Sequence, residues 1–145
     1  MAITAQRRAA REALVIEHMQ SENVQQWERT MRTFSHARYE LPDGRVIDGQ
    51  DAVMRYWIEG RTLVPDQRNE LISLTHVGGE RVQIEFWLRG TPTTTGKPFE
   101  IRLWAVYDFD GSDRMTNERV YAAPPTVDQI EGRVTTAGRR RDASA

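Results

Sequence analysis

Glu118 is the side chain of this sequence that is best suited to move a proton. It lies in the segment 114–123, which we predict to be a β-strand, and it shares a face of that strand with Val120. Burial raises the pKa of carboxyl groups in general, so a glutamate on an inward face is a candidate general acid or base. The alternative is a structural ion pair with Arg102 or Arg119, and the sequence leaves both interpretations open.

The chain has three histidines and no cysteine. His36 follows a predicted helix, and we predict that it reaches the mouth of an apolar pocket enclosed by the sheet and the helices. An imidazole there could take part in acid/base chemistry, because imidazole titrates near neutrality. The alternative for His36 is helix capping or a loop hydrogen bond. His18 is expected to be a core histidine with its hydrogen bonds satisfied, and His76 is given no role. The histidine spacing matches no metal-ligand motif and no Gly-rich phosphate loop is present, so we predict no metal site and no cofactor.

Aromatic side chains are predicted to form the walls of the pocket. Tyr39 and Glu40 are adjacent in one short strand, so only one of them can face inward. Hydroxyl groups on such walls can orient a carbonyl group of a ligand, although wall residues are more often plain core. The predicted ligand-binding residues are Tyr39, Glu40, Tyr56, Trp57, Phe86, Tyr107 and Tyr121.

Alternation of apolar and polar residues predicts the strands that carry these side chains. The long strands are expected at 70–77, 81–91, 99–109 and 114–123, with a short hairpin at 38–47. Between the last two strands, Gly111 is expected to supply the positive φ of a tight turn. Apolar residues at helical spacing predict helices over 6–22, 24–34 and 51–63, with Asp51 as the N-cap of the third.

This order of elements predicts an α+β fold, a cone or barrel in which three helices cover the concave face of a curved antiparallel sheet. Phe86, Leu103 and Tyr107 would belong to the inner face. Trp87 and Trp104 would lie on the outer face among charged residues. Because aromatic and arginine side chains are enriched at interfaces, we predict a homodimer through this outer face.

Length and charge narrow the class of protein. A chain of 145 residues with a formal net charge of −1 has no basic excess for nucleic acid or a membrane surface. We predict one domain over residues 1–132, followed by a disordered basic tail over 133–145. No segment has the length and hydropathy of a membrane span or a signal peptide, so a cytoplasmic protein is expected.

Several short motifs occur together in one known fold. They are Glu22-Asn23, the runs 33–41 and 48–53, Leu88-Arg-Gly-Thr91, the run 106–111 and Glu118-Arg-Val-Tyr121. On these motifs the chain resembles the SnoaL-like, ketosteroid-isomerase-like branch of the nuclear transport factor 2-like superfamily, over roughly residues 7–132. The resemblance implies a cone-shaped domain with an apolar pocket, and many enzymes of this superfamily place carboxylates in that pocket.

The usual catalytic carboxylates of the superfamily are absent from this chain. By resemblance, the two acids of ketosteroid isomerases fall on Leu41 and Ala105, and the two aspartates of limonene epoxide hydrolases fall on Val120 and Ala123. Isomerisation by the usual pair of acids is therefore not expected, and Glu118 is the acid that remains on the last strand.

Two functions remain open at this point. The first is a cofactor-free acid/base enzyme of the cyclase, isomerase, hydrolase or dehydratase type. Its substrate would be a polyketide-, steroid- or terpenoid-like molecule, and its catalytic residues would be Glu118 and His36. The second is a non-catalytic dimeric protein that binds a hydrophobic small molecule in the same pocket.

Overall fold

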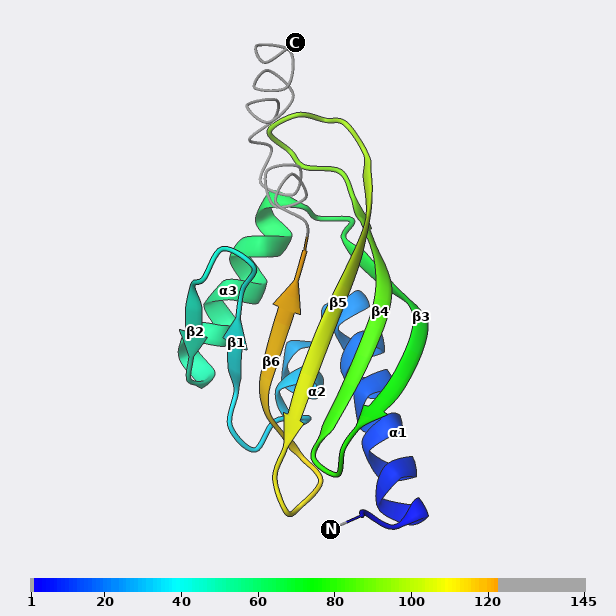
Figure 1. The fold of residues 1–145 in the computed structure, drawn as a ribbon. Coiled ribbons are helices and arrows are strands. Elements are labelled where there is room, and N and C mark those ends of the chain that lie inside the picture. Colours follow the sequence, from blue (N-terminus) through cyan, green and yellow to red (C-terminus); the bar gives the residue numbers. More distant parts are fainter. Residues whose placement is uncertain (1, 123–145) are drawn as a thin grey trace.

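A strongly curved sheet with helices on one face makes up the fold in the computed structural model, which describes residues 2–122 (Figure 1). The predicted domain end at residue 132, the tail 133–145 and Ala123 lie outside these residues. The elements in order are α1 (Ala5–Asn23), α2 (Trp27–Met31), β1 (Arg38–Glu40), β2 (Val46–Asp48), α3 (Gln50–Leu63), β3 (Arg68–Val77), β4 (Arg81–Gly90), β5 (Phe99–Phe109) and β6 (Met115–Tyr121). The α+β class is confirmed.

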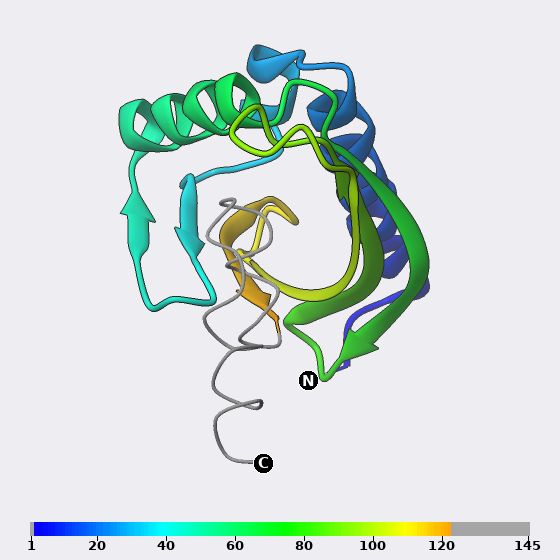
Figure 2. The same ribbon diagram turned by 90° about the horizontal axis from the view of Figure 1, so that it is seen from above.

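The sheet is mixed rather than antiparallel. Its strand order is β2-β1-β6-β5-β4-β3, and β1 pairs with β6 in parallel while every other neighbouring pair is antiparallel. The predicted barrel does not close, because β2 and β3 are the two edges of the sheet. Seen from above, β3, β4 and β5 form an arc whose concave side faces α3 (Figure 2). The core lies on this side, where Val15, Met31 and Trp57 from the three helices pack against the strands.

The helices differ in detail from the prediction. The second helix is shorter than the predicted 24–34 and begins only at Trp27. Gln25 adopts a left-handed φ of 57°, which separates α2 from the end of α1. Val24, in this connection, is 60% exposed. The third helix begins after Gly49, at a φ of 95°, so Asp51 lies within its first turn and is not the N-cap. Ala10 and Ala13 lie on the exposed side of α1.

The β5–β6 turn also departs from the expected glycine geometry. Asp113, with a φ of 61°, takes the left-handed position, and Gly111 has no positive φ. Aspartate tolerates this conformation better than most residues. Its carboxylate is held by Arg7 Nε at 3.0 Å and by Arg11 Nε at 2.8 Å, so the turn is tied to the start of α1.

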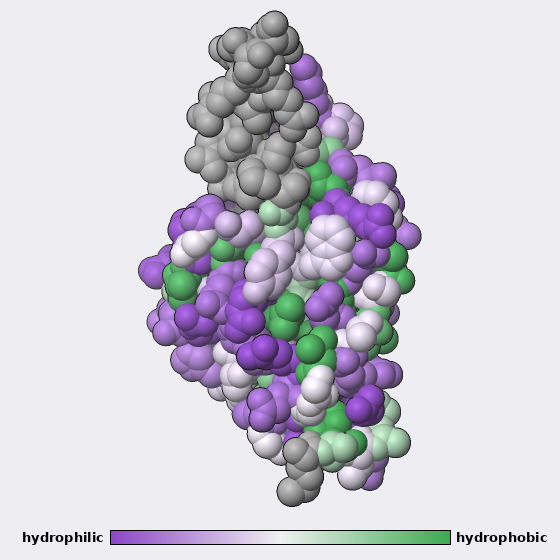
Figure 3. All heavy atoms as spheres, in the orientation of Figure 1, coloured by the Kyte–Doolittle hydropathy of each residue, from purple (hydrophilic) through white to green (hydrophobic). Residues whose placement is uncertain are grey.

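The two faces of the sheet have opposite character, as the alternation predicted. Phe86, Leu103 and Tyr107 are buried on the inner face, whereas Trp104 is 37% exposed on the outer face. On the outer face the Arg102 guanidinium lies over the rings of both Trp87 and Trp104. The face turned away from the helices is mostly hydrophilic with scattered hydrophobic side chains (Figure 3).

Gly90, at the end of β4, is a position where a side chain would not fit. A Cβ there would overlap Cγ1 of Val64, a buried β-branched side chain with little freedom to rotate. We expect Gly90→Ala to lower the free energy of unfolding by about 1–3 kcal/mol, measured by urea denaturation. Gly60→Ala in α3 is the control, because nothing lies within 4 Å and the change should raise stability by about 0.5–1 kcal/mol. Equal effects of the two substitutions would contradict this account.

Candidate functional site

A cavity of about 140 Å³ lies between the concave face of the sheet and the helices. At about 30 Å³ for each water in the liquid, it has room for about five water molecules, or for about one ring of a ligand, since a cavity of about 150 Å³ holds benzene. Apolar and aromatic side chains form most of its wall. The lining residues are Met19, Glu22, Tyr39, Leu41, Pro42, Asp43, Arg45, Tyr56, Gln67, Asn69, Ile84, Phe86, Leu88, Leu103, Tyr107, Glu118 and Val120.

One row across the sheet brings three of the predicted residues together. Tyr39 on β1 is paired in register with Glu118 on β6, and Glu118 is paired with Tyr107 on β5. Residues paired in this way point to the same face of a sheet. All three are buried, with Glu118 only 6% exposed, and the Tyr107 hydroxyl donates to Glu118 Oε1 at 3.3 Å. Glu118 is therefore a buried carboxylate in the wall of an apolar cavity.

The partner of Glu118 is His18, which was expected to be a core histidine with its hydrogen bonds satisfied and was not predicted as a site residue. His18 Nε2 lies 3.2 Å from Glu118 Oε2, and the His18 ring is fully buried behind the cavity wall. Arg102 and Arg119, the alternative partners considered for Glu118, pair elsewhere: Arg102 contacts Glu85 at 2.8 Å and Arg119 contacts Glu40 at 2.6 Å. Glu118 thus belongs to a histidine–carboxylate pair inside the fold.

Hydrogen bonds fix the protonation of one nitrogen of His18. The hydroxyl of Thr33 donates its single hydrogen to the Thr30 carbonyl at 2.6 Å, so it must accept at 2.8 Å from His18 Nδ1–H. Nδ1 therefore carries a proton in both charge states of the ring. Nε2 faces Glu118 Oε2, and two lone pairs at 3.2 Å would repel each other. The Tyr39 hydroxyl lies 3.1 Å from the same nitrogen, so a proton on Nε2 would lie between this hydroxyl and the carboxylate.

The electrostatics of the site favour the charged imidazole. Burial by itself would lower the pKa of His18, but the hydrogen bond and negative charge of Glu118, with the charge of Glu22, raise it above its ordinary value. The pKa values of Tyr39 and Tyr107 are raised well above the ordinary value, first by burial and then by the charge of Glu118. Both tyrosines therefore keep their hydroxyl protons.

A second carboxyl group, Glu22 on α1, was also missed as a site residue. Its Oε2 lies 3.6 Å from His18 Nε2, and its side chain lines the cavity with 15% exposure. Burial raises the pKa of Glu22. His18 and Glu22 are four residues apart on one helix, which places both on the same face. That spacing, on the side of α1 that carries the buried Val15 and Met19, is the sequence signal that could have found the pair.

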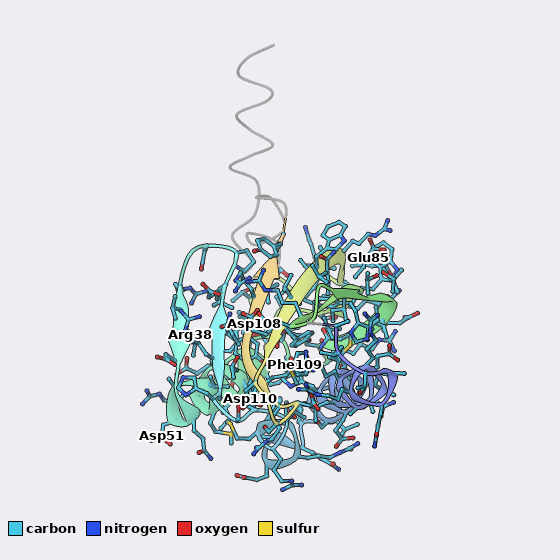
Figure 4. The ribbon with its side chains drawn as sticks, turned by 60° about the horizontal axis from the view of Figure 1, so that its bottom comes forward. Arg38, Asp51, Glu85, Asp108, Phe109 and Asp110 are labelled. Carbon is cyan, nitrogen blue, oxygen red and sulfur yellow. The ribbon has the colours of Figure 1, made fainter. Side chains whose placement is uncertain are left out.

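Three predicted site residues point away from the cavity, and His36 and Glu40 are the first two. The side chain of His36 is 57% exposed and contacts Asp48 Oδ1 at 2.6 Å, so His36 does not reach the pocket mouth. Glu40 faces outward because it follows the inward-facing Tyr39 in the same strand. Its carboxylate accepts from Asn117 Nδ2 at 2.7 Å, within an outer-face cluster that includes Arg38 and Asp108 (Figure 4).

The remaining wall predictions are placed as follows. Tyr56, Phe86 and Tyr107 line the cavity. Trp57 is buried beside it and donates from Nε1 to the Tyr39 hydroxyl at 3.1 Å. Tyr121 is not part of the wall, because it lies on the outer face opposite Trp104 and is 50% exposed.

The positions where relatives would carry aspartates are apolar here. Leu41 and Val120 are in the cavity wall, and Ala105 is fully buried on the same inner face. Among residues 2–122 no group of three histidines, aspartates or glutamates is arranged to hold a metal ion. Within the same residues no helix has both the length and the apolar composition to cross a membrane.

Comparison with known proteins gives a family match and close similarities of fold. The family model of the SnoaL-like domain matches residues 15–118. No curated protein sequence matches at a significant level. A nuclear transport factor 2-like protein of unknown function from Burkholderia pseudomallei is 16% identical, with a TM-score of 0.75, and the match covers 83% of this chain and 96% of that one.

Two further solved structures share the fold. A protein with a ketosteroid isomerase-like fold from Catenulispora acidiphila, solved with trimethylamine, is 14% identical with a TM-score of 0.72, over 82% of this chain and 92% of that one. SalBIII, an epoxide hydrolase/cyclase-like enzyme with a role in pyran ring formation in the polyether salinomycin, is 17% identical with a TM-score of 0.72, over 81% and 93%.

Proposed function

This chain belongs to the SnoaL-like domain family, and we propose that it is an acid/base enzyme whose working group is Glu118. The observation that carries the proposal is the buried Glu118 carboxylate, which lines the cavity and lies 3.2 Å from His18 Nε2. A carboxylate in such a site accepts a proton from an acidic C–H or O–H of a bound molecule. His18, behind the wall, is a positioning residue that holds the carboxylate and balances its charge.

Tyr56 can supply a hydrogen-bond donor to a carbonyl oxygen of the substrate. Its ring is part of the wall, and its hydroxyl has no hydrogen-bond partner among the described residues. Burial raises its pKa, so the hydroxyl stays protonated. A hydroxyl in this position can donate to a carbonyl oxygen on which negative charge develops.

The substrate we propose is a hydrophobic, oxygenated molecule of the polyketide, steroid or terpenoid class. The apolar wall favours ring carbons, and the size of the cavity fits about one ring, at the reacting end of the substrate. The role of SalBIII in making a pyran ring of a polyether supports the polyketide class. The reaction would be of the cyclase, isomerase, hydrolase or dehydratase type, in each of which a carboxylate moves a proton.

The test is a panel of aromatic polyketide ketones, steroid ketones and terpenoid epoxides, followed by mass spectrometry in deuterated water. Conversion of a member, or uptake of deuterium at its acidic carbon, is the expected result. A ligand that binds tightly without conversion or exchange would overturn the enzyme and support the alternative, a protein that only binds small molecules.

The outer face of the sheet is the surface we propose for a homodimer. Trp104 and Tyr121 are neighbours there, 37% and 50% exposed, beside the arginine-covered Trp87. We expect the wild type to sediment as a dimer at micromolar concentration and Trp104→Glu to sediment as a monomer, because a charge in an apolar contact is not compensated. Val77→Glu on the edge strand β3, 43% exposed, is the control and should leave the dimer intact. A monomeric wild type would overturn the proposal.

A further inference from the structure

Glu22 and Glu118 converge on one nitrogen atom. Glu118 Oε2 is 3.2 Å and Glu22 Oε2 is 3.6 Å from His18 Nε2. Because Nδ1–H is bound to Thr33, His18 has only the Nε2 proton to offer to both carboxyl groups. Two carboxylates that close together in a buried site repel each other, and such pairs keep a proton on one member.

The contacts decide which carboxyl group keeps the proton. Glu118 has the shorter contact with His18 and also accepts the hydroxyl hydrogen of Tyr107. Glu22 lies farther from His18, at 3.6 Å, and its second neighbour is the neutral amide of Asn69, which donates to it. The Arg61 Nη2 is 3.9 Å from Glu22 Oε1 and donates instead to the Glu22 backbone carbonyl at 3.0 Å. The ionised form is therefore better supported at Glu118 than at Glu22.

The surroundings of Glu22 come from six elements. Besides His18, these surroundings contain one buried cation, the guanidinium of Arg61, which lies over the ring of Trp27. The groups that face Glu22 are His18 on α1, Glu118 on β6, Arg61 and Tyr56 on α3, Tyr39 on β1, Tyr107 on β5 and the amide of Asn69 on β3. The anionic neighbour and the burial outweigh the more distant Arg61.

We propose that Glu22 is a second working carboxyl group of the cavity, that it is protonated in the resting protein, and that it donates a hydrogen bond to an oxygen of the ligand. The ligand class that follows is a ketone or a phenol, whose oxygen accepts this hydrogen and carries negative charge when Glu118 removes a proton. Only the ligand class rests on the proposed function, since the protonation of Glu22 is a property of the protein alone.

The first experiment needs no ligand. Glu22→Gln keeps the shape and the neutral charge of a protonated glutamate, so it tests the protonation directly. In the native protein a proton retained by Glu22 is lost on unfolding above the ordinary pKa of glutamate, which disfavours the wild type as the pH rises. Relative to the wild type, Glu22→Gln should therefore gain in urea midpoint as the pH rises above about 4.3, the ordinary pKa of glutamate.

The control and the opposite outcome are equally clear. Glu59→Gln, on the exposed side of α3, should show no such gain. A fall in the midpoint of Glu22→Gln over the same pH range would show that Glu22 is an ionised partner of His18 or Arg61 and would overturn the proposal. Carbon NMR of the assigned side-chain carboxyl groups should agree, with the pKa of Glu22 above the ordinary value of about 4.3 for glutamate.

The second experiment tests the ligand class with para-nitrophenol, whose absorbance separates phenol from phenolate. Glu22→Gln keeps a hydrogen-bond donor and should bind the phenol within about twofold of the wild type, whereas Glu22→Leu should bind it about tenfold more weakly. Equal binding by the glutamine and leucine variants, or no binding by the wild type, would overturn the ligand class. The unfolding result would stand in either case, and neither experiment depends on turnover.

Discussion

Replacing Glu118 by glutamine should lower kcat on any substrate found in the panel by about 10²–10⁴-fold. The amide keeps the size of the side chain and can still meet the Tyr107 hydroxyl, but it cannot accept a proton from a substrate. The loss should appear in kcat more than in KM, because the removed interaction belongs to the transition state. Steady-state kinetics and the rate of deuterium uptake by the substrate both measure it.

Glu85→Gln is the matched control for this experiment. Glu85 lies on the neighbouring strand β4 but faces outward, where it pairs with Arg102 at 2.8 Å. Its substitution should leave kcat unchanged. If Glu118→Gln retained full turnover, or if both variants lost it equally, Glu118 could not be the group that moves the proton.

Replacing His18 by leucine should lower the free energy of unfolding by about 3–5 kcal/mol, the range found when one partner of a buried pair is removed. The change leaves the Glu118 carboxylate without a cation and removes the hydrogen bonds that His18 makes with the Thr33 and Tyr39 hydroxyl groups. His36→Leu is the control, because its pair with Asp48 is exposed and should contribute less than about 1 kcal/mol. Equal losses in the two variants would contradict the buried pair.

The pH dependence of stability provides a second measurement on the same variants. The folded-state pKa of His18 is raised, so its contribution is complete below the unfolded value of about 6.5 and disappears as the pH rises through the folded value. Urea denaturation of the wild type should show this fall above about pH 6.5, and His18→Leu should lack it. A wild-type curve that rises over this range would contradict the assignment.

Strand alternation made much of the site accessible from sequence. A residue in a strand can face only two ways, so alternation limited Glu118 to a pocket or to the surface, and it assigned Trp104 to the outer face. The same rule stated that one of Tyr39 and Glu40 faces outward without deciding which. In the structure Tyr39 faces inward, because its hydroxyl contacts the buried His18 and Trp57, and Glu40 therefore faces outward.

The helix and loop residues of the site were not predictable in the same way. Helical spacing showed that His18 is buried but not what it meets, since its partner Glu118 lies far along the chain on another element. His36 was chosen because it follows a helix near the expected pocket, but its loop turns it toward Asp48 in solvent. The parallel pairing of β1 with β6 was missed for a related reason: no turn joins these strands, so no local pattern marks it.

That parallel pairing also determines when the site can come into being as the chain folds. The hairpins β3–β4, β4–β5 and β5–β6 join neighbours in sequence, so each can close with a short loop. β1 can reach β6 only after a long loop has closed, which costs more chain entropy and slows such contacts. A chain that has completed its hairpins therefore already contains most of the sheet, yet Tyr39 and Glu118 are still apart, and the cavity exists only once this last neighbour has docked.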